Sequence, residues 1–135
     1  MSLFGIFDAA GSAMSAQTVR LNTVASNLAN ADVVAPDAQS AYRARMPVFA
    51  SVLSEQAGAA DGVRVDRLVL SEAEPQREYA PEHPQADAEG YVWHSNVNVV
   101  EEMANMTSAS RSYQSSVEVV STVKRLMLAT LRMGQ

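Results

Sequence analysis

The chain has 135 residues, enough for one domain, and 47% of them are hydrophobic but only 6% are aromatic. Its net charge of −5 argues against DNA or RNA as a partner, and its lack of cysteine excludes disulfides and thiolate metal sites. No apolar run is long enough to span a membrane. Because Met1–Asp8 also lacks the basic and apolar parts of a secretory signal peptide, we expect any export to follow another route.

Residues 1–31 are expected to form the first of three regions, a long helix from about Phe4 to Ala31. Two rows of residues recur every seven positions along it, which is the spacing of a coiled coil. The first row is Phe7, Met14, Leu21 and Leu28, and the second is Ala10, Gln17, Val24 and Ala31.

Three asparagines are unusual in this first helix, because Asn is a poor helix former. They are Asn22, Asn27 and Asn30. They could face solvent, or Asn30 could end the helix. They could also bridge neighbouring subunits through side-chain hydrogen bonds, and this is the reading we favour.

Residues 32–95 are expected to form a small β region. Strands are predicted where β-branched and aromatic residues gather, in Val63–Leu70, Ala41–Ala50 and Tyr91–Trp93. Gly58 and Asp61–Gly62 predict a turn before Val63. The prolines between Pro75 and Gly90 predict an extended or looped segment.

Residues 96–135 are expected to form a second long helix. Asn98 and Glu101 have the spacing of a capping box, Glu101 and Glu102 suit the positive end of the helix dipole, and Gly134 is a plausible stop. One row follows a 3–4 spacing along it: Met103, Met106, Ser110, Tyr113, Val117, Val120, Lys124, Met127 and Leu131.

Polar residues interrupt the rows of both helices, so neither helix is expected to be stable alone. We expect a mainly α fold with a small β insertion, in which the two terminal helices pair as a coiled coil and then meet other chains. The isolated chain is expected to be monomeric and only partly helical.

No arrangement of residues for catalysis or for metal or cofactor binding is apparent. His83 and His94 lack further ligands at convergent spacing. Glu101 and Glu102 point about 100° apart on a helix, so they cannot face each other as an acid/base pair. Nucleophile motifs and phosphate-binding glycine loops are missing from the sequence. We therefore expect a protein that is not an enzyme.

Three stretches resemble the flagellar rod and hook axial proteins in the order and spacing of that family. They are Leu21–Asn30, Tyr79–Val92 and Asn96–Gln114, the last of which begins Asn-Val-Asn-Val-Val-Glu-Glu-Met. The second stretch and the short length point to the proximal part of the rod, and the form of the third differs from that of the short proximal subunit FlgB. Ala31–Val34 and Ser95 depart from the family pattern, at helix–loop junctions.

The resemblance implies a structural subunit that polymerises helically, connects the inner-membrane ring to the distal rod and transmits torque. It implies as partners the rod subunits FlgB, FlgF and FlgG, further copies of this chain, the junction proteins FliF and FliE, and the flagellar type III export apparatus. It implies a place in the periplasm-spanning rod of the basal body, reached without a cleaved signal peptide and without membrane insertion.

The helix rows and the resemblance together indicate which residues make assembly contacts. They are Phe7, Met14, Leu21, Asn22, Val24, Asn27, Leu28, Asn30, Asn96, Asn98, Glu101, Glu102, Met103, Met106, Tyr113, Val117, Val120, Met127 and Leu131. A cytoplasmic coiled-coil adaptor or export chaperone is the main alternative function. A small α+β enzyme or ligand-binding domain is a further alternative, and it would need a pocket with perturbed ionisable groups.

Overall fold

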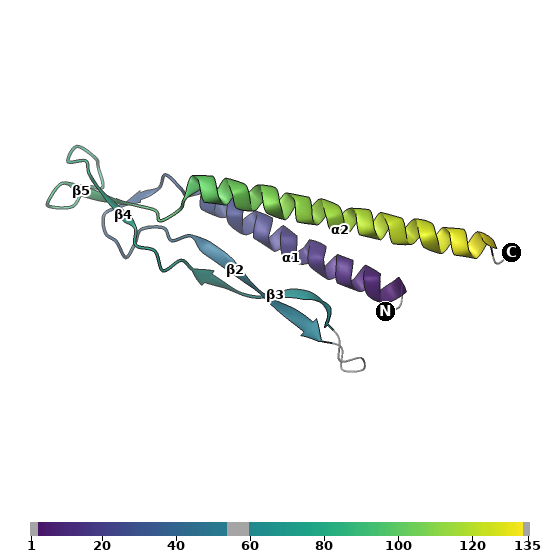
Figure 1. Ribbon diagram of the computed structural model, residues 1–135. Coiled ribbons are helices and arrows are strands. Elements are labelled where there is room, and N and C mark those ends of the chain that lie inside the picture. The colour runs from purple at the N-terminus through teal and green to yellow at the C-terminus, as the bar shows by residue number, and fades with distance from the viewer. Residues whose placement is uncertain (1–2, 54–59, 134–135) are drawn as a thin grey trace.

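The computed structural model describes residues 3–53 and 60–133 and has an elongated shape (Figure 1). Helices α1 (Leu3–Ala29) and α2 (Val99–Met133) lie side by side and antiparallel, so the start of α1 and the end of α2 lie at one end of the molecule. At 1.5 Å per residue α2 is about 52 Å long and α1 about 40 Å, and α2 extends beyond α1. Neither helix is long and apolar enough, within the described residues, to cross a membrane.

Five strands lie between the helices in the sequence: β1 (Val34–Ala35), β2 (Arg45–Leu53), β3 (Ala60–Leu70), β4 (Gln76–Tyr79) and β5 (Tyr91–His94). Strands β2 and β3 form an antiparallel two-stranded sheet that lies along α1, on the side away from α2 (Figure 1). Strands β1, β5 and β4 form a small antiparallel sheet in that order, beyond the far end of the helices. The mainly α fold with a β insertion is thus confirmed.

The ends of the helices facing the β region are set by asparagines. The Nδ2 of Asn30 donates to the Ser26 carbonyl at 2.8 Å, and helix α1 ends at Ala29, two residues before the predicted end. The Oδ1 of Asn98 accepts from the backbone nitrogens of Val100 at 3.1 Å and Glu101 at 3.2 Å. Asn98 is therefore the N-cap of α2, as predicted, and Asn30 helps to end α1.

The two helices pair through small side chains. Ala10, Ala16 and Val24 are buried on α1, and Ala109 and Val123 are buried on α2. Ala109 has no exposed surface, which requires the helices to approach closely at that point. Gln17 lies in the same α1 row as Ala10 and Val24, and its Oε1 is buried without a hydrogen-bond partner among the described residues.

The sequence left open whether the expected row of α2 faces α1 or another subunit. In the structure the buried positions of α2 are Glu102, Ala109 and Val123, each one residue before Met103, Ser110 and Lys124 of that row. Two causes set this rotation: Ala109 admits α1 closely, and Glu102 bonds to α1 through Asn27. Large apolar residues of the predicted seam are consequently exposed, among them Met103 and Leu131.

The β region matches the sequence in part. The strands predicted around Val63, within Ala41–Ala50 and at Tyr91 correspond to β3, β2 and β5. The turn expected at Asp61–Gly62 is wrong, because both residues belong to β3, and Gly58 lies outside the described residues, as does Gly134. Gly62 instead allows β3 to lie close to Ser12 of α1, because a Cβ at position 62 would come within 2.5 Å of the Ser12 Oγ. Strands β1 and β4 were not predicted, because both are short.

Candidate functional site

A cluster of polar side chains, which we call the junction, joins the end of α1 to the starts of β2 and α2. It consists of Asn27, Tyr42, Arg45 and Glu102. The Oδ1 of Asn27 accepts from the Tyr42 hydroxyl at 3.0 Å and from the Arg45 backbone nitrogen at 2.9 Å. Its Nδ2 donates to the Arg45 carbonyl and to Glu102 Oε2, each at 2.9 Å. The amide thus uses both of its donors and both acceptor sites.

Asn27 acts toward β2 as the backbone of a neighbouring strand would. It bonds both the N–H and the C=O of Arg45, which is the pairing of an antiparallel ladder. Among side chains only an amide offers a donor and an acceptor in this geometry. Asn27 is 0% exposed, so the expectation that it bridges subunits is wrong: its hydrogen-bonding capacity is used within the chain.

Glu102 brings a carboxylate into this closed cluster. It is the fourth residue of α2 and is buried, whereas its neighbour Glu101 is exposed. The positive end of the α2 dipole favours a negative charge at this position. Glu101 and Glu102 were expected to have the same roles, at the cap and at the helix dipole. This expectation is corrected, because Glu102 also connects α2 to the end of α1 through its hydrogen bond with Asn27.

A second asparagine, Asn96, holds together the two chain segments at the same end of the β2–β3 hairpin. The Oδ1 of Asn96 accepts from the Ala44 backbone nitrogen at 2.6 Å, and its Nδ2 donates to the Ala73 carbonyl at 2.7 Å. Asn96 therefore links the residue before β2 to the segment after β3. Three asparagines of the family-like stretches, Asn27, Asn96 and Asn98, accordingly hold the chain to itself around one point.

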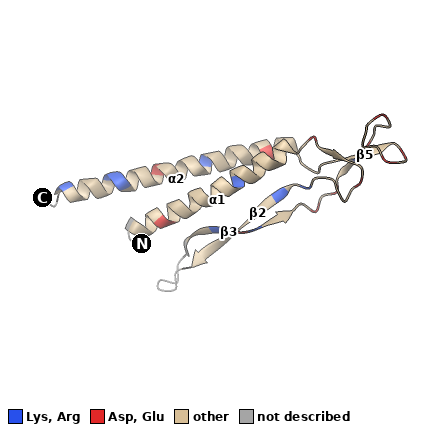
Figure 2. Cartoon of the chain, turned by 180° about the vertical axis from the view of Figure 1, so that it is seen from behind, with Lys and Arg blue, Asp and Glu red and all other residues tan. Residues whose placement is uncertain are grey.

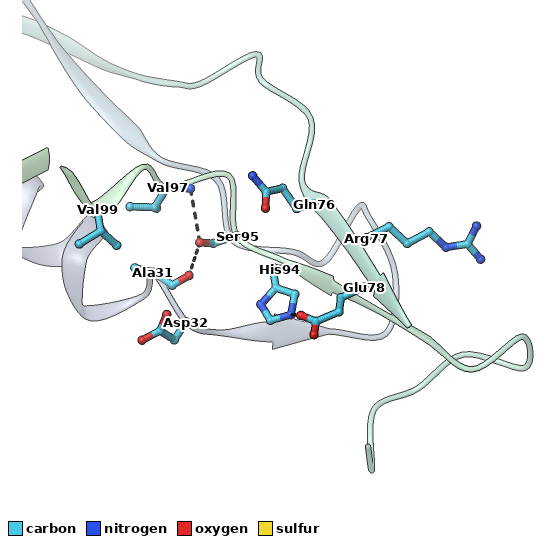
Figure 3. Close-up of a pocket in the computed structure, with 9 residues that line it drawn as sticks. All are labelled: Ala31, Asp32, Gln76, Arg77, Glu78, His94, Ser95, Val97 and Val99. Atoms are coloured by element: carbon cyan, nitrogen blue, oxygen red, sulfur yellow. Dashed lines mark hydrogen bonds and ion pairs between the residues drawn. The ribbon is translucent and has the colours of Figure 1, made fainter. Parts of the chain in front are cut away.

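A shallow hollow next to the junction collects further polar residues (Figure 3). Ser95 donates through Oγ to the Ala31 carbonyl at 2.6 Å, joining the two ends of the β region. On neighbouring strands, His94 Nε2 and Glu78 Oε2 lie 2.7 Å apart. No group of three or more His, Asp or Glu side chains within the described residues could hold a metal ion.

The predicted assembly residues fall into three classes of exposure. Buried are Val24, Asn27 and Glu102. Half-buried are Phe7, Met14, Leu21, Leu28, Asn30, Asn96, Met106, Val120 and Met127. Exposed are Asn22, Asn98, Glu101, Met103, Tyr113, Val117 and Leu131. The structure thus brings Asn27 and Glu102 together and leaves the exposed group available to other molecules.

Sequence reasoning missed the residues that complete these contacts. Tyr42 and Arg45 lie in a predicted strand, and their contacts with Asn27 span 15 and 18 positions. Ser12 accepts a hydrogen bond from the Val63 backbone nitrogen at 3.1 Å and fixes β3 to α1. Arg20 donates to Asn105 Oδ1 at 2.9 Å between the helices.

Comparisons with known proteins match both terminal regions of the chain to flagellar rod proteins. The family model described as "Flagella basal body rod protein" matches residues 7–36, and "Flagellar basal body rod FlgEFG protein C-terminal" matches residues 88–133. The chain is 54% identical to the flagellar basal-body rod protein FlgC of Escherichia coli O6:H1, and 53% identical to that of Salmonella typhimurium. It is 38% identical to that of Buchnera aphidicola from Acyrthosiphon pisum. Each comparison covers 100% of both chains.

Proposed function

The chain belongs to the FlgC family of flagellar basal-body rod proteins, and we propose that it polymerises helically to connect the inner-membrane ring to the distal rod and to transmit torque. Membership makes it a structural subunit of the basal-body rod that interacts with other rod components. The finer parts of the proposal concern how it assembles and what it joins.

One observation carries this proposal: α2 leaves much of its apolar surface uncovered. Val100 is 75% exposed, Leu131 68% and Met133 80%, and Leu126 and Leu128 are also exposed. Isolated exposed apolar residues are ordinary, but a long helix that shows them along its whole length presents a surface suited to other helices. Helical polymerisation would cover that surface.

The proposed neighbours follow from a position in the proximal rod. They are the rod subunits FlgB, FlgF and FlgG, further copies of this chain, and FliF and FliE at the junction with the ring and the export gate. The subunit would reach the periplasm-spanning rod through the flagellar type III apparatus, without a cleaved signal. The small side chains that pair α1 with α2 support such a route, because a core of this kind resists unfolding only weakly.

Electron microscopy of basal bodies from a strain deleted for this gene tests the proposal. We expect inner-membrane rings that lack rod, hook and filament, and complete basal bodies after complementation with the gene. A deletion of flagellin serves as the control, because it removes only the filament. Complete rods in the deletion strain, in the absence of a second flagellar system, would contradict the proposal.

A further inference from the structure

The charge of this chain is concentrated at the two opposite ends of the molecule. Residues 71–95, which we call the tip, contain strands β4 and β5 and the loop between them, and they lie beyond the far end of the helices (Figure 1). The tip carries six carboxylates and one arginine, a net charge of −5 that equals the net charge of the whole chain. The remaining residues are therefore neutral in sum.

Most of the charge of the tip is unpaired. Glu78 lies 2.7 Å from His94, and Asp87 lies 3.5 Å from Arg77. The other four carboxylates are exposed, and their side chains make no hydrogen bond or ion pair with any residue that the structure describes: Glu72, Glu74, Glu82 and Glu89. These four side chains are free to meet a cationic partner.

The tip also presents an ordered aromatic face. Four side chains share one face of its sheet: Arg77, Tyr79, Tyr91 and Trp93. The guanidinium of Arg77 lies 3.8 Å from the centre of the Tyr91 ring, and the rings of Tyr79 and Tyr91 meet edge to face at 5.1 Å. Tyr79 is nevertheless well exposed. Tyr, Trp and Arg are enriched at the hot spots of protein interfaces, and side chains that are already ordered lose little entropy on binding.

The opposite end of the molecule, formed by the last turns of α2, is basic (Figure 2). We call Lys124–Met133 the basic end. Its three cations, Lys124, Arg125 and Arg132, are exposed, and none of them forms an ion pair with another described residue. No Asp or Glu follows Glu118 in the sequence. Two exposed leucines, Leu128 and Leu131, lie among the cations.

Between these two ends the charges are balanced locally or stand alone. At the junction, two arginines and two glutamates line one hollow. In the β2–β3 hairpin, Arg64 and Arg67 flank Asp66 at 3.4 Å and 2.7 Å. Glu118 is a single carboxylate in the middle of α2. The tip and the basic end are thus the two concentrations of unpaired charge in the described chain, and their signs are opposite.

We propose that the basic end of one copy of this chain docks on the tip of a second copy. The proposal rests on the proposed function, since it describes one contact within the rod. Helix α2, about 52 Å long, separates the two surfaces within one chain, so a single chain cannot bring them together (Figure 1). In the contact, the cations meet the free carboxylates of the tip, and Leu128 and Leu131 cover Tyr79. Because the two surfaces differ, repeated contacts give an open head-to-tail chain and not a closed dimer.

Cysteine crosslinking tests this contact, because the chain has no cysteine of its own. Ala88→Cys in the tip is combined with Thr130→Cys in the basic end, both at exposed positions, and the double variant replaces the wild-type gene. Isolated basal bodies are treated with a bismaleimide, a crosslinker that joins two thiols without requiring disulfide geometry. A denaturing gel should show a band at twice the mass of the chain, and neither single variant should give it.

The matched control combines Ala88→Cys with Ser112→Cys, an exposed position in the middle of α2. It should assemble rods and give no such band. The proposal is wrong, while the rod function stands, if the first pair supports swimming without the band, if both pairs crosslink equally, or if the tip crosslinks only to a different protein. If the wild-type gene fails to restore rods, the proposed function itself is at fault.

A charge exchange covers the case in which the cysteine pair fails to assemble. The tip is reversed by Glu72→Lys, Glu74→Lys, Glu82→Lys and Glu89→Lys, and the basic end by Lys124→Glu, Arg125→Glu and Arg132→Glu. Reversal of either surface alone places like charges in the contact and should abolish swimming, whereas reversal of both should restore it. All seven positions are exposed, so circular dichroism should show unchanged folding. An equal loss in all three variants contradicts the proposal.

Discussion

The junction and the distal half of α2 differ in how far one chain completes its own contacts. At the junction, the amide of Asn27 is fully bonded within the chain and 0% exposed. In the distal half of α2, Val123 is the only buried residue among the described positions, and Leu126, Leu128 and Leu131 are exposed. One chain therefore completes the contacts of its junction, whereas the distal half of α2 keeps exposed apolar residues that we propose neighbouring subunits cover.

The largest effect is expected from Asn27→Leu. Both backbone groups of Arg45 and the Glu102 carboxylate would lose their bonds to Asn27 in a buried site, which should lower the free energy of unfolding by about 3 kcal/mol. Urea titration of the purified chain, followed by circular dichroism, measures this change. The matched control is Asn22→Leu on the exposed face of the same helix, expected to change it by less than about 0.5 kcal/mol. Equal effects would remove the special role of Asn27.

A somewhat smaller loss is expected from Ala109→Leu. Ala109 is fully buried, so the larger side chain has no room there, and overpacking of this kind costs about 2 kcal/mol. The same urea titration measures the loss. Ser108→Leu, on the exposed neighbouring position, should leave the midpoint almost unchanged. A tolerated Ala109→Leu would mean that the helix pair is not closely packed.

Gln17→Leu should stabilise the isolated chain by about 1 kcal/mol, because it removes a buried amide oxygen that lacks a partner. Thermal unfolding monitored at 222 nm compares the variant with wild type. A destabilised Gln17→Leu variant would show that the amide has a favourable role in the helix pair.

Leu131→Asp should have almost no effect on the isolated chain, within about 0.5 kcal/mol, because Leu131 is exposed. It should nevertheless abolish rod assembly, since it places a charge in a surface that neighbours would cover. Complementation of a deletion strain measures assembly. Leu21→Glu and Val120→Glu should also block assembly, but both residues are half-buried and should lower stability as well. Normal swimming by Leu131→Asp would contradict the claim that neighbouring subunits cover the distal half of α2.

The smallest effect is expected at the turn around Asp37. Hydrogen bonds from Ser40, mainly its backbone nitrogen, hold the pKa of Asp37 below its usual value of 3.8, and the Gln39 backbone nitrogen adds a weaker contribution. A lowered pKa stabilises the turn above pH 3.8, and this contribution is lost as the pH falls through the lowered value. The protection of the Ser40 amide, measured against the exchange rate of an unprotected amide at the same pH, should therefore fall in acid. In Asp37→Asn, which keeps the acceptor, the protection of this amide should not change with pH in this range.

The sequence predicted the elements of this fold better than their orientation. Helix rows and capping residues located both helices, and β-branched residues located β2, β3 and β5. The sequence did not decide which face of α2 meets α1: large apolar residues such as Met103 and Leu131 stay exposed, whereas the contacts of Ala109 and Glu102 set the rotation of the helix. The junction was missed because its bonds join residues up to 75 positions apart. A local pattern can mark Asn27 as unusual, but it cannot name Tyr42, Arg45 and Glu102 as its partners.

Hydrogen exchange with mass spectrometry, on the free chain and on isolated basal bodies, tests the contrast between the junction and the distal half of α2 most directly. We predict that the backbone amides of Ala44 and Arg45 are protected in both states, since Asn96 and Asn27 bind them within the chain. The amides of residues 124–133 should exchange quickly in the free chain and become protected only in the rod. Equal protection of that segment in both states, or protection of the junction only after assembly, would contradict the account.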